Sequence, residues 1–226
     1  MEALWIVLVV LLAGGGIAFS LYLKKKRREE MATFARQNGL QYSAHDPFQT
    51  LGWPFGLFQK GDGRGVENVV WGPWQGGSNV TAFDYWYYTE TTDSKGHRSR
   101  SYHRFSCATI EVAAAFPHLE IAREGFFTRM ADHMGMEDIE FESPEFNRRY
   151  NVKAKERRFA YELLDARMLE WLVGFDQGYA FEILGNRILA YGRRTKASGL
   201  TPLLGTLTMF RDRVPRVAWT LYPLGR

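Results

Sequence analysis

The sequence predicts an α+β protein in which one N-terminal transmembrane helix precedes a cytosolic domain of antiparallel strands with a few packed helices. Three observations lead to this fold class. Residues 4–23 are a run of 20 residues without charge, residues 66–122 contain runs rich in β-branched and aromatic side chains, and residues 155–173 repeat apolar side chains at helical spacing. The 226 residues are 46% hydrophobic and 15% aromatic, which supplies a core and excludes a disordered or collagen-like chain.

The uncharged run is predicted to be a retained membrane-spanning helix. A helix of this length covers roughly 30 Å, the thickness of one hydrocarbon core. Trp5 and Tyr22 lie near its two ends, where amphipathic rings prefer the membrane interface. A cleaved signal peptide is the alternative, but residues 1–3 carry no positive charge and no small-residue cleavage site follows the run.

A basic cluster follows the run directly and sets the predicted orientation. It consists of Lys24, Lys25, Lys26, Arg27 and Arg28. By the positive-inside rule, the N-terminus lies outside and the C-terminal domain lies in the cytosol, as in a single-pass protein of the cell membrane. We expect the five cations to contact anionic lipid headgroups of the inner leaflet. Outside Glu2 and this cluster, acidic and basic residues are equal in number, so no nucleic-acid partner is expected.

The stretch after the run is predicted to continue the membrane helix. Met31, Phe34 and Ala35 form an apolar stripe at helical spacing, and Gly39 is suited to end the helix. No linker divides the rest of the chain, although a subdivision near residue 135 is an alternative. The predicted parts are an extracytoplasmic N-terminus with the transmembrane helix at 1–23, a basic juxtamembrane helix at 24–39 and a cytosolic α+β domain at 40–226.

The first half of the cytosolic domain is predicted to consist of loops and then strands. Residues 45–65 are rich in Gly-, Pro- and Asp-containing turn signals. Residues 79–89 are the strongest strand, and the polar stretch 91–100 is the expected hairpin loop to a strand at 101–112. Shorter elements are expected as strands at 66–74, 119–122 and 138–142 and as a helix at 126–134.

The second half is predicted to contain a long helix, a hairpin and a last helix. The long helix covers residues 155–173, and its apolar face consists of Ala160, Leu163, Leu164, Met168, Trp171 and Leu172. Residues 179–184 and 187–191 are predicted to pair as a hairpin, because Gly185-Asn186 between them can adopt positive φ. Thr201-Pro202 is suited to begin a last helix, which ends before Pro215.

Two groups of residues carry a resemblance to a known family. The first is Phe83-Asp84-Tyr85 in the aromatic strand. The second is Ser143-Pro144-Glu145-Phe146-Asn147-x-x-Tyr150-x-Val152, followed by Ala160-x-x-Leu163-Leu164. With the N-terminal anchor, these motifs resemble uncharacterised bacterial single-span membrane-anchored proteins that carry a domain of unknown function. The resemblance covers residues 30–192; it implies a bacterial protein of this architecture and supplies no catalytic residue.

No pattern in the sequence indicates a catalytic, cofactor-binding or metal site, and no cofactor is expected. Cys107 lies in a predicted strand and is expected to be a buried thiol rather than a nucleophile. Glu137/Asp138 and Glu140/Glu142 are paired carboxylates that leave a general acid/base pair as an alternative. The histidines contain no pair at the i, i+4 spacing of a helical metal site; they are His45, His97, His103, His118 and His133.

Glycine-rich and aromatic stretches are interpreted as structural. Gly61-x-Gly63-x-Gly65 precedes a predicted strand, which is the wrong order for a dinucleotide-binding turn. Stacking of nucleic-acid bases would require a basic groove beside the aromatic side chains, so core packing with tyrosine hydroxyls at the surface is the expectation. The aromatic side chains concerned are Phe83, Tyr85, Trp86, Tyr87 and Tyr88.

Asp84 is the acid inside the strongest predicted strand, and it needs a reason to be there because Asp is disfavoured in strands. By alternation it shares a face with Ala82 and Trp86. A hairpin loop near residues 95–96 would place opposite each other residues whose numbers sum to about 190, so Arg104 would be a diagonal neighbour of Asp84. We therefore expect either an exposed acid or an ion pair between Asp84 and Arg104.

Two classes of function fit the sequence. The first is a protein-interaction or scaffolding module, which holds an unknown protein partner at the inner leaflet. The second is a membrane-tethered enzyme of the hydrolase class. The lack of a catalytic signature favours the first class.

Overall fold

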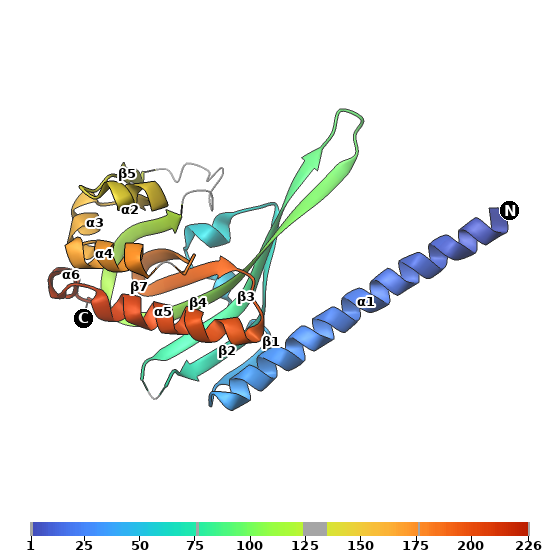
Figure 1. The fold of residues 1–226 in the computed structure, drawn as a ribbon, viewed down its shortest axis with the longest axis horizontal. Helices are drawn as coiled ribbons and strands as arrows, with labels where there is room; N and C mark the ends of the chain where they lie inside the picture. The colour runs from blue at the N-terminus through green and yellow to red at the C-terminus, as the bar shows by residue number, and fades with distance from the viewer. Residues whose placement is uncertain (1, 76, 124–134, 176, 226) are drawn as a thin grey trace.

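A computed structural model describes residues 2–75, 77–123, 135–175 and 177–225, and for residues 2–4 and 6–13 it describes the backbone alone. Seven antiparallel strands form one sheet, and helices pack on it (Figure 1), so the predicted α+β class is confirmed. The strands are β1 (Gln41–His45), β2 (Gly63–Pro73), β3 (Asn79–Thr92), β4 (Arg98–Arg123), β5 (Glu137–Ile139), β6 (Tyr150–Ala154) and β7 (Ala180–Arg193). The helices are α1 (Glu2–Gln37), α2 (Pro144–Arg149), α3 (Arg157–Leu163), α4 (Ala166–Gly174), α5 (Leu200–Arg213) and α6 (Arg216–Leu221), with 3₁₀ turns η1 (Thr50–Gly52), η2 (Gly56–Gln59) and η3 (Ala197–Gly199).

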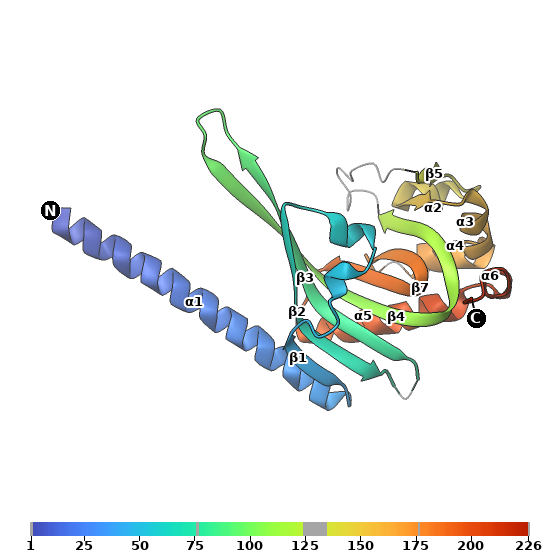
Figure 2. The same cartoon turned by 180° about the vertical axis from the view of Figure 1, so that it is seen from behind.

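The long strand β4 organises the sheet. The order is β1-β2-β3-β4-β6-β5, and β7 pairs with β4 as well. The β3–β4 hairpin has the predicted register, because Trp86 lies opposite Arg104 and Asp84 lies opposite Ser106. Its tip projects well beyond the rest of the sheet (Figures 1 and 2).

The hairpin predicted at Gly185-Asn186 is wrong. Residues on both sides of this pair belong to one strand, β7, which pairs with β4 along its length. Gly185 has φ +58° and lies opposite Phe116, where the register between β4 and β7 shifts. Gly185 therefore adopts positive φ at an irregularity within a strand. A glycine between two strand-like stretches is found at such irregularities as well as in hairpin turns, so the sequence alone does not distinguish them.

Each face of the sheet buries its own core cluster. On one face, α3, α4, α5 and the end of α1 pack over residues such as Ala82, Ile110 and Ile183. On the other face, Phe55, Leu57 and Phe58 cover a second set. That set includes Phe83, Tyr85, Cys107 and Tyr191, so the thiol is buried as expected. Of the aromatic strand, Phe83 and Tyr85 are buried, whereas Trp86, Tyr87 and Tyr88 are half-buried.

The helix predicted over residues 155–173 is two helices. Asp165 interrupts it, because its side chain accepts a hydrogen bond from Met168 N at 2.9 Å and begins α4 as an N-cap. The predicted apolar face is otherwise confirmed: five of its residues are buried and Trp171 is half-buried. The buried five are Ala160, Leu163, Leu164, Met168 and Leu172.

Other predicted elements differ in extent. The strand expected at 138–142 is the three-residue β5, and Glu140 and Glu142 lie exposed beyond it. The helix expected at 126–134 falls outside the described residues. The helix predicted from Thr201 is α5, which ends at Arg213, before Pro215 as predicted, but it is not the last helix because α6 follows with Pro215 as its N-cap.

Helix α1 is continuous from Glu2 to Gln37 and enters the core at its C-terminal end. Met31 and Ala35 are buried, and Phe34 stacks on Trp74 with ring centroids 6.3 Å apart. Gly39, at φ +68°, follows the helix end as predicted. Among the residues that the structure describes, no helix has an apolar stretch long enough to cross a membrane. Nine of the twenty residues in the predicted span, 4 and 6–13, are described by their backbone alone.

Candidate functional sites

The first candidate site is a buried cluster of charges around Asp84, where α1 meets the sheet. Arg27 Nε and Nη2 donate to the two Asp84 oxygens at 2.9 and 2.7 Å. Asn68 Nδ2 donates to Oδ2 at 3.0 Å, and Arg194 Nη2 lies 3.1 Å from the same oxygen. Asp84 is 1% exposed, and its carboxylate is held by side chains from α1, β2 and the segment after β7. A bidentate arginine is the geometry that a buried carboxylate requires.

Two predictions about this cluster need correction. Arg104 is not the partner of Asp84; its guanidinium lies over the Tyr102 ring, 5.1 Å from the centroid. Arg27 is buried, because it faces the sheet, and it is therefore unavailable to lipid headgroups. Lys24, Lys25, Lys26 and Arg28 are exposed.

A bulge in β2 makes the cluster possible. The register between β2 and β3 shifts between Glu67 and Val70, and Asn68 within the shift has φ +56°. Asparagine tolerates this left-handed conformation better than most residues. The irregularity aims the Asn68 Nδ2 group at Asp84, and Tyr42 Oη donates to Asn68 Oδ1 at 3.1 Å.

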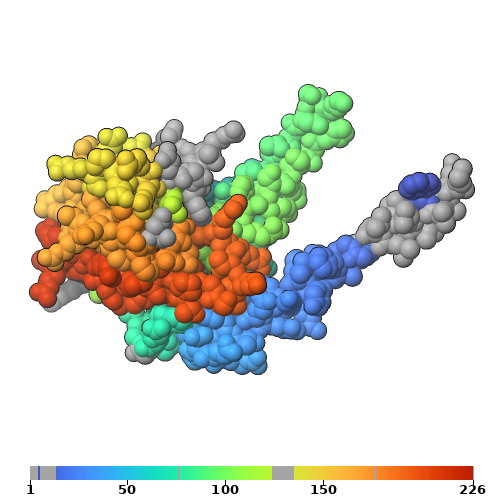
Figure 3. Space-filling view, in the orientation of Figure 1, coloured from blue at the N-terminus to red at the C-terminus, as the bar shows by residue number. Residues whose placement is uncertain are grey.

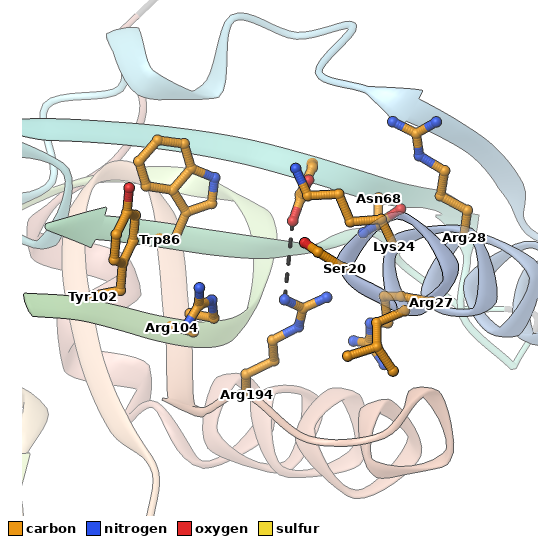
Figure 4. A pocket seen from close by; sticks show the side chains of 11 residues that line it. Ser20, Lys24, Arg27, Arg28, Asn68, Trp86, Tyr102, Arg104 and Arg194 are labelled. Atoms are coloured by element: carbon orange, nitrogen blue, oxygen red, sulfur yellow. Dashed lines mark ion pairs between the residues drawn. The ribbon is translucent and has the colours of Figure 1, made fainter. Parts of the chain in front are cut away.

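Above this cluster lies a basic cavity of about 710 Å³ between α1 and the base of the β3–β4 hairpin. Helix α1 contributes Lys24, Arg27 and Arg28 to its lining. The sheet side contributes Trp86, Tyr102 and Arg104, with Arg194 from the segment after β7 (Figure 4). Figure 3 shows α1 and the hairpin leaving the body on the same side.

The second candidate site is an acid–base cluster on the opposite face, formed by His118, Glu120 and Glu182. Glu182 is fully buried and accepts hydrogen bonds from the backbone N–H groups of Gly56 and Leu57. His118 Nε2 lies 2.6 Å from Glu182 Oε1 and 3.5 Å from Glu120 Oε1. Glu120 and Glu182 are opposite each other on β4 and β7.

The environment of this cluster shifts the pKa values of its members. Burial, followed by the charge of Glu182, raises the pKa of Glu120 to about 7. Burial lowers the pKa of Lys60 to about 8, and the charges of Glu120 and Glu182 oppose that shift. The pKa of His118 is raised; burial acts to lower it, but the hydrogen bond and charge of Glu182 outweigh that effect.

Chemically, these groups can exchange protons near neutral pH or bind a cation. The ligand atoms of His118, Glu120 and Glu182 all lie within 4.8 Å of one another, and one histidine with two carboxylates is a donor set that divalent metals accept. Sequence analysis did not group these residues. The available signal was His118 and Glu120 at alternate positions beside a predicted apolar strand, which places both on one face.

The third candidate site is an apolar groove of about 670 Å³ formed by α3, α4 and the segment before α2. Its apolar lining includes Phe141, Tyr161, Leu169 and Val173. Three carboxylates, Glu142, Glu145 and Glu170, also line it. Glu145 is bonded to Arg149 at 2.8 Å, whereas Glu142 and Glu170 make no ion pair with a described residue. The groove is therefore apolar with an acidic rim.

The fold is similar to that of one characterised bacterial protein. The likeness is to the crystal structure of the mycobacterial trehalose monomycolate transport factor A, TtfA, with a TM-score of 0.63 and 14% sequence identity. It covers 88% of this chain and 98% of that chain. At this identity the likeness shows the fold alone. No family model matches the sequence. No curated protein matches it either. The resemblance to membrane-anchored proteins with a domain of unknown function stays a prediction.

Proposed function

We propose that this protein is a membrane-anchored interaction module, which holds a protein partner at the cytosolic side of the inner leaflet. The uncharged run at residues 4–23 and the cations after it support the anchor and its orientation. Large apolar side chains on the described part of α1 are exposed, among them Ile17 at 64% and Phe19 at 62%. Such exposure is typical of a surface covered by lipid or protein.

The observation that carries the interaction role is the apolar groove with the acidic rim. Helices α3 and α4, which form it with the segment that leads into α2, lie at the end of the molecule remote from the N-terminus of α1 (Figure 1). In an anchored protein this end points away from the membrane. Apolar lining with glutamates at the rim is complementary to a basic amphipathic segment. We infer that the partner presents such a segment.

The orientation is tested with reporters fused after Arg226. A reporter active only in the cytosol is expected to work, and one active only outside is expected to be silent. Replacing Lys24, Lys25, Lys26 and Arg28 by Gln is expected to mix the two orientations, because the topological signal is lost while Arg27 stays in the core. A C-terminus found only outside would contradict the proposal.

The groove is tested by photo-crosslinking in cells. A benzoylphenylalanine at position 161 is expected to give a discrete adduct, whereas the same group at Phe48, an exposed aromatic side chain elsewhere, is not. Glu142→Lys together with Glu170→Lys is expected to remove the adduct by charge repulsion. Glu137→Lys, at an exposed carboxylate outside the groove, is the matched control and is expected to leave the adduct in place. An adduct insensitive to the rim charges would contradict the basic partner.

A second candidate function is a membrane-tethered hydrolase, which the His118–Glu120–Glu182 cluster favours. A carboxyl group with a pKa near 7, such as that of Glu120, is suited to act as a general acid. The test is turnover of p-nitrophenyl esters and phosphates by the full chain, with and without Zn²⁺ or Mn²⁺. Activity that Glu120→Gln abolishes and Glu142→Gln preserves would establish the enzyme; no activity on either substrate class would leave the interaction module as the better account.

A further inference from the structure

The basic cavity has an excess of positive charge that the protein itself does not balance. Five cationic side chains line it against one carboxylate, Glu67. Asp84 lies beneath and is already held by Arg27, Asn68 and Arg194. Lys24, Arg28 and Arg104 make no ion pair with any described residue. Like charges that share a cavity repel one another, so an anion placed among them would be stabilised.

The geometry aims donors from two sides at the same space. Lys24 projects from α1, while Arg104 and Arg194 approach from the sheet side (Figure 4). Arg194 is restrained by Asp84 and lies 3.9 Å from Glu67, so its position in the wall is fixed. Arginine forks and a lysine ammonium are the donors that proteins use for phosphate oxygens.

The remaining walls suit the apolar part of an amphiphile. Trp86 and Tyr102 form an aromatic wall, with ring centroids 6.0 Å apart. Ser20 and Leu23, which belong to the uncharged run, also line the cavity, and the exposed Phe19 and Leu21 are their neighbours on the helix. The lining therefore combines cationic, aromatic and apolar side chains, and its apolar part belongs to the predicted membrane span. Tryptophan, tyrosine and arginine are the side chains that prefer the lipid headgroup region.

We propose that this cavity binds the phosphate group of an anionic glycerophospholipid, whose acyl chains lie along the apolar part of α1. Phosphate oxygens accept hydrogen bonds from Lys24 Nζ and from the guanidinium groups of Arg104 and Arg194, and the glycerol lies against Trp86. The site rests on the proposed anchor, which places the cavity at the inner leaflet. It differs from a diffuse attraction of the basic cluster to the membrane, because it needs residues of β4 and of the segment after β7.

The test is isothermal titration calorimetry of the full chain in an uncharged detergent. The probes are dihexanoyl-phosphatidylglycerol, dihexanoyl-phosphatidylcholine and glycerol 3-phosphate. Phosphatidylglycerol is expected to bind saturably at one site. Lys24→Gln and Arg104→Gln are each expected to raise its Kd about fivefold, the effect of removing one cation beside a phosphate.

Matched controls separate the site from general charge. Lys26 is exposed on α1 but lines a different hollow, beside Lys196, and Arg98 on β4 is paired with Glu90 at 3.4 Å. Lys26→Gln and Arg98→Gln are expected to leave the Kd within about twofold. Because all four side chains are exposed, the variants are expected to keep the melting temperature of the unchanged chain.

Three outcomes would overturn the site. They are absence of saturable phosphatidylglycerol binding, equal binding of phosphatidylcholine, and equal losses in the control variants. Tighter binding of glycerol 3-phosphate than of phosphatidylglycerol would overturn the lipid source and assign the cavity to a soluble phosphate. Because the titration is done in detergent, it is independent of the reporter fusions, so a failed site and a failed topology give different results.

Discussion

At the scale of single residues, Asp84 and Arg27 connect the helix to the sheet. Their side chains are 57 positions apart in the sequence and make a two-bond ion pair inside the protein. A buried pair of this kind contributes little net stability compared with apolar packing, but losing one partner leaves a charge without compensation. Replacing either Arg27 or Asp84 alone is therefore expected to destabilise the fold.

We therefore predict that Asp84→Asn lowers the free energy of unfolding by about 3–5 kcal/mol, because the Arg27 guanidinium stays buried without its carboxylate. A double-mutant cycle with Arg27→Gln is expected to show coupling above about 1 kcal/mol. The cycle of Asp84→Asn with Arg104→Gln is the control and is expected to be additive within about 0.5 kcal/mol. The measurement is denaturant unfolding of the full chain in detergent, and equal coupling in both cycles would contradict the assignment.

Glu120 gives the molecule a predicted dependence on pH. Its pKa of about 7 in the folded chain exceeds the ordinary value of 4.5, so between these values the folded state holds a proton that the unfolded state has lost. The free energy of unfolding should therefore fall as the pH rises from about 4.5 to about 7. His118, whose pKa is raised above its ordinary value of 6.5, adds a further fall as the pH rises above 6.5.

Lys60 acts in the opposite sense at higher pH. Its pKa is about 8 in the folded chain against an ordinary 10.5, so in this interval the unfolded state binds the extra proton and stability rises with pH. Glu120→Gln is expected to flatten the acidic limb of the profile, while Glu142→Gln, at an exposed carboxylate, is expected to preserve it. Thermal melting at a series of pH values measures both. An acidic limb of unchanged slope in Glu120→Gln would rule out this origin.

At the scale of elements, local sequence patterns predicted the buried face of a helix better than the residues at which helices and strands begin and end. The apolar stripe of residues 155–173 was assigned correctly, because burial of a helical face depends only on spacing. The break at Asp165 was not foreseen, since an aspartate within a helical pattern is read as a solvated side chain unless its capping hydrogen bond is known. Gly185 shows the same ambiguity for strands, where one glycine at positive φ serves a turn or an irregularity equally well.

The candidate sites were harder to predict than the fold, for a related reason. The β3–β4 register followed from the position of one loop, and it placed Arg104 correctly opposite Trp86. The true partners of Asp84 come from α1 and from the segment after β7, which approach only when the whole sheet is assembled. Glu120 and Glu182 likewise meet through strand pairing across 62 positions of sequence, for which alternation within one strand gives no signal.

Packing of the α3–α4 pair leads to a prediction at this scale. Leu164 is 2% exposed between the two helices, so Leu164→Ala is expected to lower the free energy of unfolding by about 2–5 kcal/mol through the cavity it leaves. Arg167→Ala, at an exposed position three residues later, is expected to change it by less than about 0.5 kcal/mol. Chemical denaturation compares the two, and equal losses would mean that the buried face is assigned incorrectly.

At the scale of the whole molecule, the two projecting elements, α1 and the β3–β4 hairpin, lie at the opposite end of the sheet from the apolar groove. Helix α1 and the β3–β4 hairpin leave the body on one side, and the helices that form the apolar groove lie at the other end (Figures 1 and 3). The basic cavity lies where the two projections meet the body. Under the proposed function, one end is occupied with the membrane while the other is presented to a partner.

Helix α1 runs without a break from the uncharged run into the core. The number of residues in α1 therefore fixes the direction in which the domain faces around the helix axis. Each added residue turns everything that follows by 100° and moves it by 1.5 Å. Two alanines inserted after Leu23 would therefore rotate the groove by about 200° relative to the anchor, whereas four would return it to within about 40° of its original direction. Both insertions precede Arg27, so the melting temperature is expected to stay unchanged. If a membrane-bound partner binds the groove from one fixed direction, the crosslink from position 161 is expected to disappear with two alanines and to return with four. A crosslink that survives both insertions would show that the partner reaches the groove from any direction.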